Sequence, residues 1–222
     1  MFHSMDLEVN GVNIQKNSAH YNHTALITTI LNTGAMEKSE QGHLQLLYMD
    51  SGEDVFQSTN YSIRKRMAST SKKFHMLFRI SHGFFESNKS LHPGCSLKIL
   101  LRRAIDSICL DYKQPTTSGA VALLPKVEII DAALLIRKLL VNPAIQKMHD
   151  NILAKGGRLL YSFPARNLIT YNIADNITTH TSEVISMGKL PNTLVLGLIK
   201  AENFNGKGDE SAFSFAPHGI ES

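Results

Sequence analysis

The sequence is poor in cysteine and has no tryptophan: two cysteines occur among 222 residues. Cys95 and Cys109 are too few for a disulfide framework, and this scarcity indicates the reducing interior of a cell. No apolar run reaches the roughly 18–20 residues that span a bilayer. The opening decapeptide MFHSMDLEVN has neither a basic end nor an apolar stretch, so we expect no secretory signal. These absences favour an intracellular protein that makes no membrane contact.

Motifs for catalysis and metal binding are also missing. The ten histidines are accompanied by no HExxH or CxxC spacing, so structural roles are the better interpretation. No GxSxG turn is present, and Gly206–Asp209 lacks the GxxxxGK[ST] spacing of a phosphate-binding loop. We therefore predict no enzymatic activity, no catalytic residue, no cofactor and no metal. A hydrolase with an unrecognised site is the least favoured alternative.

Basic residues gather in short clusters, which are candidate contacts to a polyanion or to a neighbouring subunit. The net charge of +4 permits binding to phosphates without requiring it. No platform of alternating aromatic and basic residues accompanies the clusters, so a solvated surface is the alternative. The candidate residues are Arg64, Lys65, Arg66, Lys72, Lys73, Arg102 and Arg103.

Short strands dominate the pattern. Met5–Val9 alternates apolar and acidic residues and leads into Asn10-Gly11, the strongest short-range signal of a hairpin. Cys95–Ala104 alternates leucine and isoleucine with lysine and arginine, which is typical of a half-buried strand. Further strands are predicted at Phe74–Ile80, Ile105–Tyr112, Arg158–Phe163, Asn167–Ile173 and Leu194–Ile199.

A strand–helix unit stands at the centre of the chain. Lys126–Val141 is rich in β-branched and long apolar residues, which indicates strands buried in a sheet. Asn142 is a good N-cap, Pro143 suits the first helical position, and Gly156-Gly157 can end the helix. Two other segments are compatible with short helices, Tyr21–Leu31 and Tyr61–Ser69.

The sum of these elements predicts a mainly β fold with a few short helices. Many short strands separated by Gly and Pro turns are typical of a sandwich or a barrel. Gln114–Gly119 is the longest run without a large apolar residue, and it is the best candidate for a linker. It would divide residues 1–113 from residues 120–222.

Five segments share their order and spacing with those of one known family. They are a strand with an Asn-Gly hairpin, a Tyr-led helix ending in Gly, a strand–turn–basic strand, an aliphatic-Arg-Lys run and a Gly/Phe-rich block. They lie at Met5–Gly11, Tyr21–Gly34, Phe74–Ala104, Ala132–His149 and Gly188–Phe215. In this order they resemble the double jelly-roll major capsid proteins of Polinton/Maverick-type elements and adintoviruses, of which many animal genomes carry copies.

The sequence departs from this family at several points. His82-Gly83 stands where the family tends to have a His-acidic pair, and Ser211-Ala212 replaces a usual Asn-Pro. Family members continue beyond both ends of the resembling region. By this alignment, residues 1–113 are the C-terminal part of a first jelly roll and residues 120–222 the N-terminal part of a second. We therefore expect antiparallel β-sandwich pieces of a partial double jelly-roll, in a partial chain.

The resemblance implies a structural, hexon-like capsid subunit of a virus-like mobile element, or its genomic remnant. Its partners would be copies of itself in a homotrimer and capsid lattice, other capsid subunits and, as a candidate, packaged DNA. Its location would be the virion or the host cell interior, in cytoplasm or nucleus. The alternative is a cellular β-rich domain that binds nucleic acid or another protein. Affinity that falls steeply with added salt would favour nucleic-acid binding.

Overall fold

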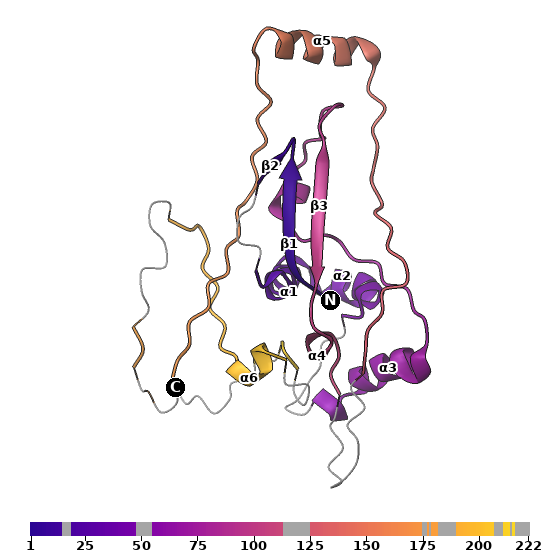
Figure 1. Ribbon diagram of the computed structural model, residues 1–222, viewed down its shortest axis with the longest axis vertical. Coiled ribbons are helices and arrows are strands. Elements are labelled where there is room, and N and C mark those ends of the chain that lie inside the picture. Colours follow the sequence, from indigo (N-terminus) through magenta and orange to yellow (C-terminus); the bar gives the residue numbers. More distant parts are fainter. Residues whose placement is uncertain are drawn as a thin grey trace.

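A computed structural model describes residues 1–14, 19–47, 55–112, 125–174, 177, 179–181, 190–206, 211–213 and 215. Figure 1 shows a small sheet with short helices around one end of it, and helix α5 beyond the other end at the tip of two extended limbs. The predicted linker Gln114–Gly119 lies outside the described residues.

The sheet has three antiparallel strands in the order β2-β1-β3: β1 is Phe2–Val9, β2 is Val12–Asn13 and β3 is Leu97–Arg103. The predicted hairpin is confirmed: Asn10 and Gly11 both have positive φ, 50° and 79°, as a tight two-residue turn requires. Strands β1 and β3 pair along their length, with a register shift between Phe2 and Ser4.

Alternation in β1 separates a buried face from a charged one. Met5 and Leu7 are completely buried, while Asp6 and Glu8 point the other way and meet the basic residues of β3. The other buried apolar residues among those described are few, namely Phe84, Ala104 and Ala212. The core is therefore small, and it lies between the sheet, helix α1 and segments far along the chain.

Short helices make up most of the remaining regular structure. The α-helices are α1 Tyr21–Asn32, α2 Ala35–Gln41, α3 Thr59–Ala68, α4 Asp106–Cys109, α5 Pro143–Ala154 and α6 Ala201–Phe204. The 3-10 turns are η1 Gly42–Gln45, η2 Val55–Gln57, η3 Ser69–Ser71 and η4 Gly83–Glu86. None of the helices in the described ranges is long and apolar enough to cross a bilayer.

The predicted caps of α5 are confirmed. The amide of Ala144 donates to Asn142 Oδ1 over 2.9 Å, and Pro143 occupies the first turn. At the other end, the amides of Gly156 and Gly157 donate to the carbonyls of Leu153 and Ile152. Gly156 has a φ of 85°, so the helix ends in the paired bonds of a Schellman motif.

Several predicted strands are wrong. Ile105–Tyr112 contains helix α4, where Asp106 stands in the first turn and forms an ion pair with Arg103. Five other predicted strands belong to no ladder of the described residues, namely Phe74–Ile80, Lys126–Val141, Arg158–Phe163, Asn167–Ile173 and Leu194–Ile199. Antiparallel strands with short helices are confirmed, but helices outnumber strands in the described ranges, so this part of the chain is not mainly β.

Candidate functional site

Residues 125–174 form an extended segment with many exposed apolar side chains, here called the arm. Its two limbs, residues 125–142 and 155–174, carry α5 between them (Figure 1). Large apolar side chains face solvent along the first limb: Leu135 is 80% exposed and Leu140 fully so. Monomeric proteins rarely leave so many large apolar side chains together in water.

The backbone of the arm is as open as its side chains. Between residues 128 and 141, no backbone amide or carbonyl bonds to the backbone of another described residue. The apolar face of α5 is also uncovered, since Ile145, Met148 and Ile152 are each about half exposed. An extended chain with unpaired peptide groups and apolar side chains is a template for strand addition.

The arm is tied to the body of the protein through residues 86–93. The hydroxyl of Tyr161 donates to the Ser90 carbonyl over 3.1 Å and accepts from the His92 amide over 3.2 Å. Lys89 Nζ donates to the Leu160 carbonyl over 2.8 Å. The second limb is therefore held against residues 86–93. For residues 128–141 of the first limb, the bond from the Ala132 amide to Asp131 Oδ1 is the only hydrogen bond within the part of the chain that the structure describes.

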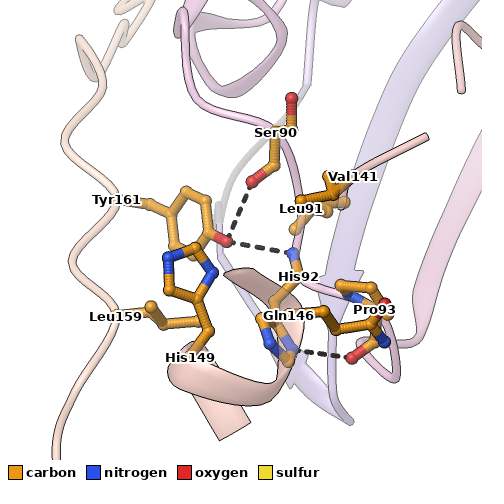
Figure 2. A pocket seen from close by; sticks show the side chains of 9 residues that line it. All are labelled: Ser90, Leu91, His92, Pro93, Val141, Gln146, His149, Leu159 and Tyr161. Atoms are coloured by element: carbon orange, nitrogen blue, oxygen red, sulfur yellow. Dashed lines mark hydrogen bonds between the residues drawn. The ribbon is translucent and has the colours of Figure 1, made fainter. Parts of the chain in front are cut away.

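A cavity of about 160 Å³ lies between residues 90–93, helix α5 and the second limb of the arm (Figure 2). His92 is fixed in it: Nδ1 lies 2.7 Å from the Pro93 carbonyl, and Nε2 lies 3.3 Å from Asp150 Oδ1. The Nε2 approach is close enough for an ion pair but lacks hydrogen-bond geometry. Because both ring nitrogens face oxygen acceptors, the ring is directed at no serine or cysteine nucleophile. The remaining lining residues are Ser90, Leu91, Val141, Gln146, His149, Leu159 and Tyr161.

The structure divides the predicted basic residues into two groups. The first, here called the basic segment, comprises Lys65, Arg66, Lys72 and Lys73, whose side chains are exposed and form no ion pair with any residue that the structure describes. Lys65 and Arg66 lie in the last turn of α3, where the helix dipole favours cations. The N-terminus of α3 is capped by Ser58 Oγ, which accepts from the Asn60 amide.

The second group is engaged within the fold. Arg102 Nη1 lies 2.6 Å from Asp6 Oδ2 and also donates to Ser4 Oγ, while Arg103 pairs with Asp106. Arg64 is half-buried beside Tyr61. Burial and the Asp111 charge raise the pKa of Tyr61, and the Arg64 charge partly opposes them. The three arginines are therefore weaker candidates for a polyanion contact than the basic segment.

The structure also brings together residues that sequence patterns do not connect. His3, His20 and His23 lie close to one another beside Phe204 and Phe213. His23 is buried, and its Nε2 lies 3.1 Å from the Ala212 carbonyl oxygen. In the described ranges, no three His, Cys, Asp or Glu side chains come together as a metal site.

Comparison with known proteins adds no relative: no family model, curated protein or solved structure matches the chain.

Proposed function

We propose that the chain is a self-associating structural subunit of the double jelly-roll capsid type, with the arm as its subunit contact. The observation that supports the proposal is the arm itself, which is apolar and whose residues 128–141 form no backbone hydrogen bond with the backbone of any other residue that the structure describes. Isolated peptide groups and large apolar side chains are stabilised by joining a sheet, where both are covered.

The sequence of the arm favours pairing with another strand, because it has few of the residues that prevent such pairing. Strands that must remain single usually carry lysines, prolines or inward charges that prevent edge-to-edge association. Between Ile129 and Val141 the charged residues are only Asp131, Arg137 and Lys138. Leucine, isoleucine and alanine occupy most of the other positions. A second copy of the chain, which carries the same apolar surface, is the simplest partner.

The family resemblance implies that this association is a homotrimer, which tiles a capsid lattice with other capsid subunits. Rigid sheets would form the walls, and the short helices and loops would meet neighbouring subunits. This function requires no catalytic residue and no cofactor.

Light scattering coupled to size-exclusion chromatography tests the proposal. We expect a mass of three times the 24.6 kDa subunit. Leu135→Asp together with Leu140→Asp should shift the protein to monomer, because each charge would be buried in the contact. Met36→Asp, at an exposed position of α2, is the matched control and should leave the trimer intact. A folded wild-type protein that stays monomeric at high concentration would refute the proposal.

A second candidate function is polyanion binding by the basic segment, favoured by its four exposed cations, which form no ion pair with the described part of the chain. Packaged DNA is the candidate ligand in a capsid, and cellular DNA or RNA in the alternative. Four phosphate contacts predict a slope of about −3 to −4 for log affinity against log salt. Fluorescence anisotropy of labelled duplex DNA measures it. Replacing Lys65, Arg66, Lys72 and Lys73 by glutamine should abolish the slope, whereas Arg102→Gln should not. Absence of binding at low salt would exclude this function.

A further inference from the structure

Three histidines from the N-terminal part of the chain meet two aromatic rings from its C-terminal part. The ring centroids of His3 and His20 are 5.4 Å apart, and those of His20 and His23 are 6.3 Å apart. Phe204 of α6 stacks on His23 at 4.5 Å and lies 4.9 Å from His20. Phe213 lies 4.9 Å from His23. The cluster joins β1 and α1 to segments about 190 residues away along the chain.

His23 is the centre of this junction, where burial favours its neutral form although the bond to the Ala212 carbonyl favours the protonated one. Its Nε2 lies 3.1 Å from the Ala212 carbonyl oxygen, so the neutral ring carries its proton on Nε2 and donates it to that oxygen. Its Nδ1 faces the side-chain amide of Asn22 at 3.2 Å, a group that can present either an oxygen or an N–H. His23, Asn22, Asn203 and Ala212 are all buried, so water does not solvate an added charge here.

Among the residues that the structure describes, the charges that act on His23 are those of His20, which precedes α1, and His3 of β1. Both carry the same sign of charge as His23 when protonated. The C-terminal segments contribute two phenyl rings and the Ala212 carbonyl, none of which titrates. Lys200 and Glu202, at the start of α6, have exposed side chains. A phenyl ring stabilises a stacked cation only modestly, which is a small effect beside burial and like-charge repulsion.

We propose that His3, His20 and His23 form an acid-released clasp, which holds α6 and residues 211–213 against α1 near neutral pH and frees them on acidification. The pKa shifts of His20 and His23 agree with this geometry. Burial lowers the pKa of His23, with the Ala212 carbonyl opposing and the charges of His20 and His3 adding to the effect. Burial and the His3 charge likewise lower the pKa of His20.

The sign of the pH effect follows from these shifts. A histidine whose folded pKa lies below its unfolded value of 6.5 binds protons preferentially in the released state. The clasp is therefore closed above that value and loses stability as the pH falls below it. An acidic compartment would open this junction.

Hydrogen exchange of the full chain tests the clasp. Between about pH 7.5 and about pH 5, after correction for intrinsic exchange rates, we expect amides of residues 201–206 and 211–213 to lose protection. Amides of β3, a strand without histidine, serve as the internal reference. His23→Gln keeps a donor for the Ala212 carbonyl and should abolish the pH response. His20→Gln removes a like charge and should move the midpoint upward, towards that of free histidine.

A control variant and a second readout complete the test. His75 is exposed, so His75→Gln should leave the response unchanged. Because the chain has no tryptophan, Phe204→Trp provides a single tryptophan stacked on His23, whose emission should shift to the red as the clasp opens. Protection of the two segments that does not change with pH, or that changes equally in His23→Gln, would overturn the proposal.

Discussion

Arg166 and Glu86 form a two-point ion pair: Nη1 lies 2.8 Å from Oε1, and Nη2 lies 2.6 Å from Oε2. The residues are 80 positions apart, and their side chains are about three-quarters buried. The pair joins the second limb of the arm to η4. The hydrogen bonds from Arg166 lower the pKa of Glu86, burial opposes them, and the charges of Arg166, Arg79 and His82 lower it further.

Replacing Arg166 by methionine should weaken the attachment of the arm. The substitution removes both charge-assisted bonds and leaves the Glu86 carboxylate partly desolvated without its main partner. We expect the free energy of unfolding, measured with urea, to fall by about 1–2 kcal/mol. Arg158→Met is the matched control, because Arg158 lies on the same limb with an exposed side chain. An equal loss in both variants would contradict a specific role for the pair.

The same pair gives a pH dependence of stability. Because the folded pKa of Glu86 lies below its ordinary value of 4.5, the pair stabilises the fold fully above pH 4.5. This contribution is lost as the pH falls from 4.5 towards the pKa of Glu86 in the folded protein. Urea midpoints measured across this range should therefore decrease more steeply in the wild type than in Arg166→Met. The window lies below that of the histidine clasp, so the two effects are separable.

Gly83 permits the close approach of the arm to η4. A Cβ at this position would collide with the carbonyl oxygen of Pro164, which is backbone and cannot rotate away. Gly83→Ala should therefore displace the second limb and destabilise the protein by about 1–3 kcal/mol. At Gly34, the N-cap of α2, a Cβ would meet nothing within 4 Å, so Gly34→Ala should cost only about 0.5–1 kcal/mol, the difference between glycine and alanine as an N-cap residue. Thermal unfolding compares the two; equal melting temperatures would show that the limb does not need this contact.

The features that sequence patterns predicted correctly are those that depend on neighbouring residues alone. The Asn10-Gly11 turn requires positive φ, and both caps of α5 depend only on residues within one turn of the helix ends. These features need no knowledge of the rest of the fold. By contrast, the ion pair of Arg102 with Asp6 depends on the register of β1 and β3, which alternation alone does not give.

Two other features depend on distant segments and were beyond prediction from one sequence. The apolar pattern of Lys126–Val141 predicted buried strands, which is wrong for the described residues, because a strand also needs a partner, which no pattern within the segment identifies. The histidine cluster has no spacing motif, because His3, His20 and Phe204 meet only through tertiary packing. The nearest sequence signal was the number of histidines, which says nothing about which of them meet.

The cap of α5 offers a measurement that links local stability to assembly. A helix of 12 residues with an exposed apolar face is marginal by itself, so its termini should decide how often it opens. Asn142→Ala removes the bond to the Ala144 amide and should cost about 1 kcal/mol of local stability. Hydrogen exchange of α5 amides should then accelerate about fivefold at low protein concentration. Asn151→Ala, at an exposed position inside the helix, is the control and should slow exchange slightly, since alanine has the higher helix propensity.

At high concentration, the proposed contact between subunits would cover the apolar face of α5 and add stability that does not depend on the cap. The effect of Asn142→Ala on exchange should then shrink as the trimer forms, because opening of α5 would also require release of a neighbouring subunit. If exchange in both proteins is independent of concentration over the range in which light scattering detects assembly, α5 lies outside the contact. Residues 128–141 would then form the contact alone.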